Sequence, residues 1–541
     1  MQVQERYEHG GRDLSGALSP ELLLRAADLE RIADDLGAYH ARFAPLFARQ
    51  EQRAWAEVYL RGLLVADVPR KNVEAMALSL LGAGTGADRW VRALQQFVGR
   101  GAWDDDAILA EHQRFVDETL GEADGVLIID GSDVAKQGTH SAGVARQWCG
   151  ATGKKDNCQA GVFLAYASRK GATLLDRRLY LPAAWFTEAY ADRWQACAIP
   201  LGTPFQTKHD LAGDLVERAV QRGTRRARWV VCDEGFGDDP ALLARLDALD
   251  LCYLAEVPRA TQVWPLADPA TGQERARPQS WVPPQTVTRK GPAPRRARVH
   301  PASPLKLRVD ATAAQLPATA WQRYRILEGS KGPLVADFAR VRASAVRDRL
   351  PATEVWVVLR RKVEGPAEVP DLKYYLSNAP ADTPLDTLVW LSGMRWPIEC
   401  CFAECKSERG LDHYEMRFWP GWHHHMTLVL LAHHFLVQLQ ARLDQREGGL
   451  GRVATGPSAP DDGAPGAITS PHPGLGAGLP APARARAASE CRRSPGAPAR
   501  PAAAAPLRSP GGAGAAALPA APQARGLLVA PQAPVAAPCA A

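Results

Sequence analysis

The chain has 541 residues, 46% hydrophobic and 23% charged, which is enough for roughly two to four globular domains. No apolar run reaches the roughly 18 to 20 residues of a membrane-spanning helix, and the N-terminus lacks a secretory signal pattern. Ten cysteines without a pairing rhythm are typical of a reduced cytoplasmic protein. Nine arginines and four acidic residues from Arg446 onward supply +5 of the net charge of +6, so DNA binding by the rest needs local basic patches.

Residues 1–120 are predicted to form a helical N-terminal domain. Pro20 stands near the start of a leucine-rich pattern with helical spacing. Residues 71–81 and 88–97 then read as two short helices around a glycine-rich turn. The pair could be a helix-turn-helix that reads DNA or an ordinary helical hairpin, because it contains no diagnostic residue.

Residues 121–257 show the alternating pattern of a mixed α/β sheet. The expected elements are strands at 126–130, 159–168 and 172–181, a helix at 210–222 with Asp210 as its N-cap, a strand at 229–233, a helix at 240–249 and a strand at 251–257. Two apolar runs end on an aspartate, Val126-Leu-Ile-Ile-Asp130 and Trp229-Val-Val-Cys-Asp233. For either aspartate alone, a turn or cap role is the alternative.

Residues 258–386 read as a β-rich insertion. Short β-like runs stand at 321–327, 334–341, 354–360 and 374–376. Trp264 could stack on an unpaired base at a cleaved DNA end, or it could be a core residue.

The remaining chain divides into residues 387–445, which complete the core with two helices, and a tail at 446–541. The tail is rich in Ala, Pro, Gly and Arg and has no aromatic residue. It is predicted to be disordered, since it cannot bury enough apolar surface to offset its ordering entropy.

The stretch from Ser392 to Gly410 carries the main evidence about function. If it is a helix, Arg395, Glu399, Phe402 and Lys406 share one face. One carboxylate between two cations suits a site that holds a metal ion and grips phosphates. The alternative is a surface helix with ordinary ion pairs.

Together with this glutamate, Asp130 and Asp233 could converge at one edge of the sheet. Three carboxylates repel one another unless cations lie among them, and their hard oxygen atoms suit Mg²⁺. Two such ions support in-line attack on a phosphodiester. The sequence therefore predicts a metal site at Asp130, Asp233 and Glu399.

Other polar residues near these positions are given lesser roles. Asp133 and Glu234 lie beyond the ends of the two apolar runs, Glu404 points elsewhere on its helix, and Asp412 follows the helix end. Cys400, Cys401 and Cys405 with His413 could suggest zinc, but they lack paired C-x2-C spacing, so packing roles are favoured. His423 to His425 are read as interface residues.

The spacing Arg395-x3-Glu399-x6-Lys406 fits the Tyr-x2-Arg-x3-Glu-x6-Lys signature of a branch of the DDE superfamily. The chain resembles a bacterial insertion-sequence transposase of that superfamily from about residue 35 to residue 440. Similar flanking segments are Phe43 to Arg49, Lys136 to Trp148, Asn157 to Tyr166, Leu179 to Pro182, Asp233 to Gly237 and Gly410 to Arg417.

The resemblance implies an RNase H-like fold, a mixed α/β sheet flanked by helices and interrupted by the β insertion. It also implies a metal triad of Asp130, Asp233 and Glu399, holding two Mg²⁺ or Mn²⁺ ions. Arg395 and Lys406, with Lys136 as a further candidate, are then expected to bind DNA phosphates. The expected partners are the terminal inverted repeats and target DNA, bound by a homodimer through the N-terminal domain in the bacterial cytoplasm.

Two features depart from this family pattern. Ser392 stands at the tyrosine position of the signature, and the tail does not resemble the family's C-terminal region. A reading-frame shift after about codon 445 of a GC-rich gene would explain the tail. Two further readings stay open, an RNase H-type nuclease without strand transfer and an inactive remnant that only binds DNA.

Overall fold

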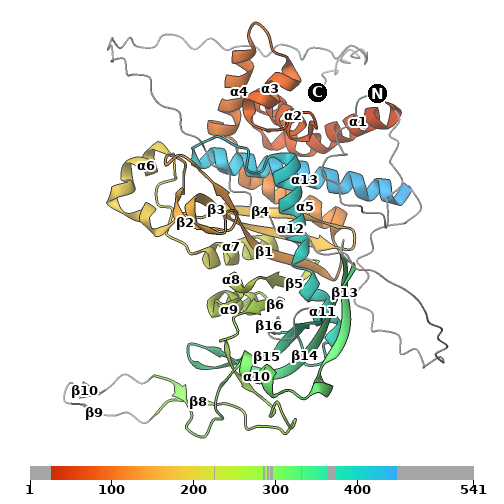
Figure 1. Cartoon of the computed structure of the whole chain (residues 1–541). Helices are drawn as coiled ribbons and strands as arrows, with labels where there is room; N and C mark the ends of the chain where they lie inside the picture. The colour runs from red at the N-terminus through yellow and green to blue at the C-terminus, as the bar shows by residue number, and fades with distance from the viewer. Residues whose placement is uncertain are drawn as a thin grey trace, which may run out of the picture. The chain divides into compact units, whose positions relative to one another are not determined.

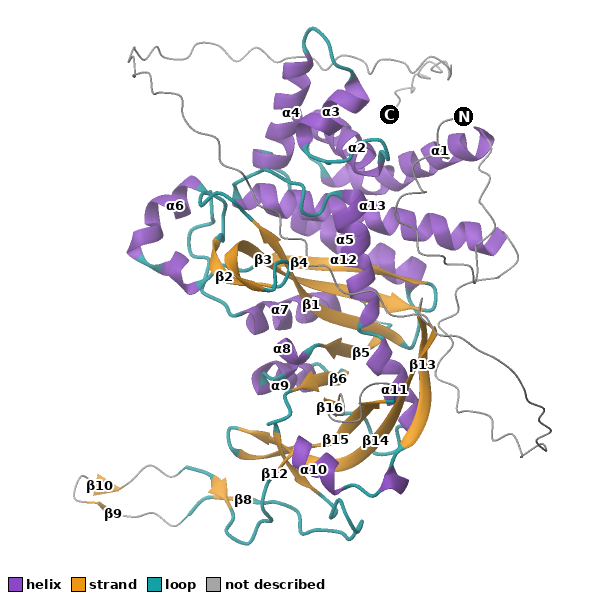
Figure 2. Ribbon diagram, viewed as in Figure 1, coloured by secondary structure: helices purple, strands orange, loops and turns teal. Residues whose placement is uncertain are grey.

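The computed structural model describes residues 26–224, 226–283, 287–288, 291–292, 296–329, 332–363 and 372–446. The predicted tail after Arg446 and the first 25 residues lie outside this part. Within it, helices flank and connect the strands, with the N-terminal helices at one end of the unit and the insertion strands at the other (Figure 2).

The N-terminal region is helical, as the sequence predicts. Its helices are α1 Ala26–Phe43, α2 Gln50–Leu64, α3 Val73–Leu81, α4 Ala87–Arg100 and α5 Asp105–Leu120. Asn72 caps α3 by accepting a hydrogen bond from the amide of Ala75, and α3 ends at Gly82, which has a φ of +89°. The pair of short helices expected at residues 71–97 is therefore present.

The core sheet contains β1 Gly125–Ala135, β3 Lys154–Ser168, β4 Gly171–Leu179, β5 Ala227–Cys232 and β6 Cys252–Val257. These strands lie in the order β4-β3-β1-β5-β6. β3 runs antiparallel to the other four, which share one direction. This is an RNase H-like arrangement, as expected from the sequence. A short strand, β2 Ala145–Cys149, pairs with the first half of β3 and was not predicted.

Helices α7 Lys208–Gln221, α8 Glu234–Gly237 and α9 Pro240–Ala248 connect the strands, with short α6 at Ala191–Ala196. The prediction that Asp210 is the N-cap of α7 is wrong. Thr207 is the N-cap, and Asp210 accepts hydrogen bonds from its amide and hydroxyl, forming a capping box.

The insertion extends the core sheet. Its elements are β7 Gln262–Pro265, β8 Ser280–Trp281, β9 Val287–Thr288, β10 Gly291–Pro292, β11 Arg298–Val299, β12 Leu307–Arg308, α10 Val309–Gln315, β13 Gln322–Gly329, β14 Gly332–Arg347, β15 Leu350–Lys362 and β16 Leu372–Ser377. β16 returns to pair with β6, which produces a continuous 12-stranded sheet.

The chain then forms α11 Leu385–Gly393, α12 Trp396–Arg409 and α13 Trp419–Arg446. α13 lies between the N-terminal helices and the sheet (Figure 1). The single helix predicted from Ser392 to Gly410 is wrong in its first turn, because the chain breaks at Met394 and Arg395 and restarts with Pro397 at the helix N-terminus.

Two hydrophobic clusters line the two faces of the sheet. The first cluster packs under α12 and α13 and reaches the N-terminal helices, and the second packs under α7 and α9. Among the described residues, no helix is long and apolar enough to cross a membrane.

Candidate active site

The register of the central strands places the two predicted aspartates side by side. Ile129 on β1 pairs with Cys232, the last residue of β5. Asp130 and Asp233 therefore occupy the next positions, where the pairing of these parallel strands ends. β1 itself continues to Ala135, so the prediction that it ends at Asp130 is wrong. The 15-residue β3 keeps supplying hydrogen-bond partners after β5 has stopped.

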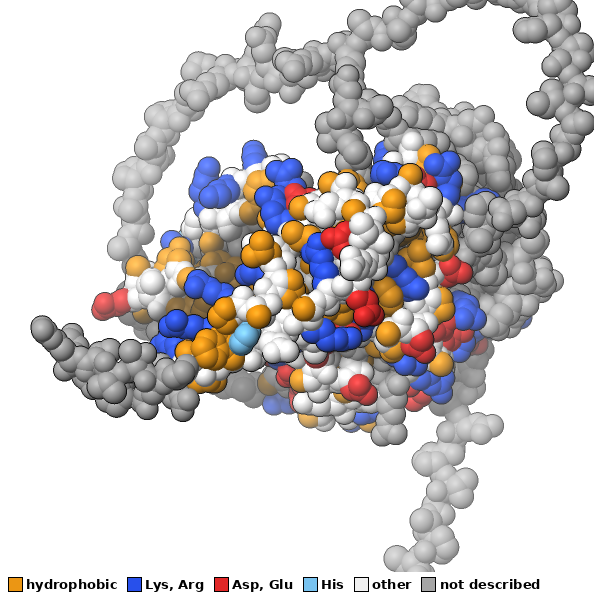
Figure 3. Space-filling model, turned by 90° about the horizontal axis from the view of Figure 1, so that it is seen from below, with side chains coloured by type: hydrophobic (Ala, Val, Ile, Leu, Met, Phe, Trp, Pro, Cys, Tyr) orange, Lys and Arg blue, Asp and Glu red, His pale blue; other side chains and the backbone are white. Residues whose placement is uncertain are grey.

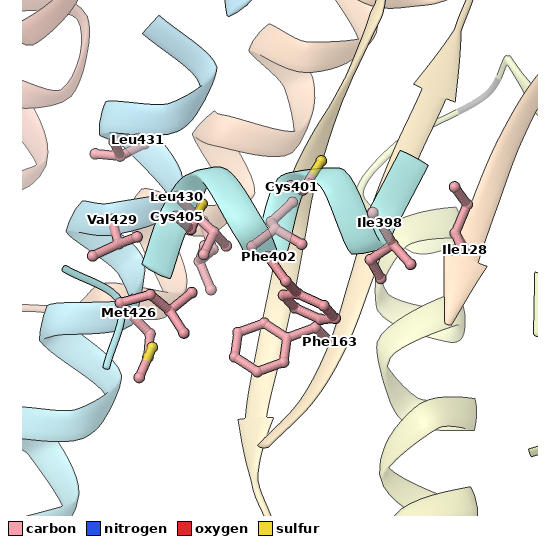
Figure 4. Packing of buried hydrophobic residues seen from close by; sticks show 14 of the residues in the cluster. Ile128, Phe163, Ile398, Cys401, Phe402, Cys405, Met426, Val429, Leu430 and Leu431 are labelled. Atoms are coloured by element: carbon pink, nitrogen blue, oxygen red, sulfur yellow. The ribbon is translucent and has the colours of Figure 1, made fainter. Parts of the chain in front are cut away.

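Both aspartates belong to the sheet face that α12 covers. Side chains alternate between faces along a strand, and Ile128 and Val231, two residues before each aspartate, lie in the hydrophobic cluster that includes Ile398 of α12. Figure 4 shows Ile398 facing Ile128, with Phe402 against Phe163 farther along α12. Glu399 follows Ile398 directly, in the first turn of α12.

Arg395 links the glutamate to the first aspartate. Its Nη1 atom lies 2.5 Å from Oε1 of Glu399 and 3.6 Å from Oδ2 of Asp130. Burial lowers the pKa of this guanidinium, but Glu399 and Asp130 more than compensate and raise it. The structure thus brings together Asp130, Glu399 and Arg395 as the sequence predicts.

Asp233 has a structural role in addition to its place beside Asp130. It is the N-cap of α8 and accepts a hydrogen bond of 3.2 Å from the amide of Phe236. A cap role for this aspartate is therefore real, yet it leaves the second carboxylate oxygen for other ligands. Burial raises the pKa of Asp233, and Glu256 adds to that rise.

Asp130 is a largely buried carboxylate with a second negative charge, that of Asp233, close to it. Burial and then the charge of Asp233 raise its pKa to about 7, against the opposing effects of the Gly131 amide and Arg395. Ionising both aspartates is costly without a nearby cation. Hard carboxylate oxygens under mutual repulsion are the donor chemistry that Mg²⁺ prefers, so these residues fit a divalent ion.

In the described part of the chain, no three His, Cys, Asp or Glu side chains stand close enough together to hold an ion as they are placed. Arg395 lies between Asp130 and Glu399 and neutralises them instead. The guanidinium therefore has to give up at least one carboxylate for all three predicted ligands to meet one ion.

The two lysines predicted to bind DNA differ in their surroundings. Lys406 lies two turns after Glu399 on α12, is partly exposed, and forms no ion pair with the residues that the structure describes. Lys136 is not an exposed loop residue. Its Nζ donates a hydrogen bond to the carbonyl oxygen of Tyr414 at 3.2 Å and lies 3.6 Å from the centre of that ring. Burial lowers its pKa to about 8.

The neighbouring carboxylates given lesser roles are engaged elsewhere or exposed. Asp133 accepts a hydrogen bond of 2.7 Å from the amide of Gly150. Glu404 lies 3.1 Å from Nε2 of His433, on a different side of α12 from Glu399. Glu234 is exposed in the first turn of α8, and Asp412 follows the C-cap of α12.

Cysteine and tryptophan side chains that could have bound zinc or DNA are packed in the interior. Cys401 and Cys405 are buried in the cluster under α12, where they pack rather than bind zinc. Trp264 is 1% exposed and donates a hydrogen bond to the carbonyl oxygen of Pro304. It is therefore a core residue and cannot stack on a base in this conformation.

Glu256 is a carboxylate beside the candidate site that the sequence pattern did not reveal. On β6, Ala255 pairs with Cys232 of β5, so Glu256 stands level with Asp233 on the same face. It is only 9% exposed, and Nζ of Lys373 on β16 lies 2.7 Å from its Oε1. An acidic residue near the end of the otherwise apolar run at 251–257 was the available signal.

A comparison with protein families matches residues 42–333 to the family described as DDE superfamily endonuclease. The matched segment is more than half of the chain and contains Asp130, Asp233 and Glu256. The chain belongs to the DDE superfamily endonucleases. No curated protein matches the chain.

Membership has direct consequences for this site. DDE superfamily endonucleases act on DNA and generally use divalent metal ions. Two of the predicted ligands of this DDE endonuclease lie inside the matched segment. Glu399, Arg395 and Lys406 lie beyond its end at residue 333, so their place in the site depends on the contacts described above.

Proposed function

We propose that this DDE endonuclease is the transposase of a bacterial insertion sequence, of the branch with the Arg-x3-Glu-x6-Lys spacing. It binds the terminal inverted repeats of its element, cleaves the ends and joins them to target DNA by attack of a 3′-hydroxyl. The observation that supports this best is the position of Arg395, which forms ion pairs with Glu399 on α12 and with Asp130 on β1, while Asp233 stands beside Asp130 at the end of β5.

In this proposal the three carboxylates hold Mg²⁺ or Mn²⁺. The ions, when bound, supply activation of a water or 3′-hydroxyl and stabilisation of the leaving oxygen. Arg395 and Lys406 bind backbone phosphates, and each phosphate neutralised contributes about −0.9 to the slope of log affinity against log salt. Lys136 holds the α12–α13 connection through Tyr414 and could reach DNA only by leaving that contact.

The DNA-end contact is assigned to α4. Arg92, Gln95 and Gln96 are exposed on this second helix of the N-terminal pair, and they line a cavity of about 480 Å³ together with Arg100 and Arg417. Arginine and glutamine are side chains that can read guanine and adenine edges in a major groove. Dimerisation on two ends and a cytoplasmic location remain part of the proposal by family analogy.

The face that carries the insertion has mixed charge. On the face that carries the insertion, lysine and arginine side chains are interspersed with acidic ones and form no continuous basic surface (Figure 3). The end-binding surface is therefore placed on α4 and beside the carboxylates rather than on the insertion.

The test is Mg²⁺-dependent cleavage of a duplex carrying the element's terminal repeat, by the full chain and by E399Q, with Ca²⁺ as a non-catalytic ion. We expect cleavage and joined products from the wild type and at least about 100-fold less from E399Q, since one metal ligand is lost. E404Q, on another side of the same helix, should keep activity.

Failure to transfer strands or to cleave would each point to a different function. Cleavage without joined products would indicate a nuclease that does not transfer strands. Repeat-specific binding without cleavage would indicate an inactive remnant, with Ser392 as the first position to examine. Ser392 donates its hydroxyl to the carbonyl oxygen of Val389 and supplies no tyrosine ring.

A further inference from the structure

Three adjacent strands each present a carboxylate at the same level of the sheet. Ile129 pairs with Cys232, and Cys232 pairs with Ala255. The residues that follow, Asp130, Asp233 and Glu256, therefore form a row across β1, β5 and β6. Neighbouring strands lie about 4.8 Å apart, so Glu256 is as near to Asp233 along the row as Asp130 is.

All three members of the row face α12. Leu254, two residues before Glu256, lies in the same hydrophobic cluster as Ile128 and Val231, which precede the two aspartates by the same interval. Tyr375, the partner of Glu256 on β16, lies in that cluster too. Glu256 thus belongs to the surface on which Arg395 and Glu399 lie.

The buried carboxylate of Glu256 needs nearby positive charge to be stable. Lys373 neutralises Glu256 from the side away from Asp233, through an ion pair of 2.7 Å in which the glutamate side chain is 12% exposed and the lysine 39%. Glu256 also acts across the row, because its charge raises the pKa of both Asp233 and Arg395. The lysine accounts for only one of the two carboxylate oxygens.

We propose that Glu256 is a fourth carboxylate of the active site, which strengthens divalent-ion binding at Asp130 and Asp233, while Lys373 partly neutralises it from the opposite side. The inference rests on the proposed function. Glu256 adds negative charge beside the ligands and attracts Arg395, so the guanidinium is held less tightly by Glu399 and Asp130. Both effects favour binding of a divalent ion by these carboxylates over their ion pairs with Arg395.

The test measures Mn²⁺ binding to the full chain without DNA, by electron paramagnetic resonance of the free ion. We expect E256Q to weaken Mn²⁺ binding about fivefold to tenfold, and E256D to restore most of it. K373M should leave the affinity equal or raise it, because it removes a competing positive charge and leaves the carboxylate.

Asp337 provides the matched control. It is a buried carboxylate on β14 with ion pairs to Arg323 and Arg361, of 2.9 Å and 3.1 Å, and it does not belong to the row. D337N should leave Mn²⁺ affinity unchanged. Melting temperatures of all variants separate loss of the site from loss of the fold.

Each outcome decides something. Unchanged affinity in E256Q, with binding lost in D130N, overturns this inference and leaves the proposed metal site standing. An equal loss in E256Q and K373M also overturns it, because the pair then only supports the fold. If E256Q does not fold because it leaves Lys373 unpaired, the double variant E256Q/K373M is compared with K373M. It should bind Mn²⁺ about fivefold to tenfold more weakly than K373M, and equal binding by the two overturns the inference. Wild-type protein that binds no Mn²⁺ through Asp130 overturns the proposed function itself.

Discussion

At the scale of single residues, the ionised carboxylate of Asp130 lowers the stability of the folded protein. An ordinary aspartate ionises near pH 3.9, whereas burial and Asp233 raise the pKa of Asp130 to about 7. The folded state therefore holds its proton more tightly than the unfolded chain does. The resulting loss of stability begins as pH rises above about 4 and is complete above about 7.

Replacing the residue should remove this penalty. We expect metal-free D130N to be more stable than the wild type by about 1–3 kcal/mol at pH 8, and by less at pH 5. Urea unfolding at the two pH values measures it. D133A is the control, since Asp133 accepts a hydrogen bond from the amide of Gly150 and losing that bond should destabilise the protein. A D130N protein that is destabilised equally at both pH values would contradict the expectation.

Which site residues could be predicted from the sequence depends on whether a local pattern marks them. Asp130 and Asp233 could be predicted because each closes an apolar run, and Arg395 and Glu399 because they are four residues apart. Glu256 could not be placed, because its nearness to Asp233 follows from the pairing of β5 with β6, which no local pattern encodes. The partner of Lys136 is equally nonlocal, since Tyr414 is 278 residues away.

At the scale of elements, α12 holds Glu399 through its buried face. Phe402 is 8% exposed and packs edge-on against Phe163 of β3, with ring centres 5.3 Å apart. F402A should reduce the free energy of unfolding by about 3–4 kcal/mol through lost burial and a cavity. Chemical denaturation measures the change.

The same helix supplies a control for that substitution. Trp396 is 56% exposed in the first turn of α12, so W396A should cost less than about 1 kcal/mol. Similar losses in the two variants would mean that α12 does not pack on the sheet as described. A fall in Mn²⁺ affinity in F402A alone would show that this packing also positions Glu399.

Most elements could be predicted, but their connections could not. Periodicity located α3, α4, α7, α9, β4, β5 and β6 to within three residues, but β1 ends five residues later and β3 begins five residues earlier than predicted. The insertion strands were predicted as short runs, yet β14 has 16 residues and β15 has 13, and β16 joins the core sheet. Such pairing links segments more than 100 residues apart, and local patterns carry no information about it.

At the scale of the whole molecule, α13 joins the N-terminal helices to the catalytic core through buried histidines. His425 shares a hydrogen bond of 2.8 Å with the hydroxyl of Tyr59 on α2 and lies 3.0 Å from the carbonyl oxygen of Gly410. His424 bonds to the carbonyl oxygen of Val98 on α4, and His433 to Thr173 on β4. The interface role predicted for these histidines is confirmed for His424 and His425, whereas the ring of His423 bonds to the carbonyl oxygen of Trp419 on α13 itself.

This junction should make the described fold sensitive to acid as one unit. Burial lowers the pKa of His423 and His425 to about 3, against about 6.5 in an unfolded chain. Their folded-state pKa is depressed, so their contribution is fully present above pH 6.5 and is lost as pH falls from there toward 3. Each histidine should cost about 1–2 kcal/mol of stability between pH 7 and pH 5.

The variant H425Q isolates one histidine, because glutamine can keep a donor and an acceptor but does not titrate. Its loss of stability from pH 7 to pH 5 should be smaller than that of the wild type by about 1–2 kcal/mol, as measured by urea unfolding. Hydrogen exchange at pH 5 should show α2 and β4 losing protection together, since α13 contacts both. If α2 opened while β4 stayed protected, the N-terminal helices and the core would be separate folding units, and α13 would not couple them.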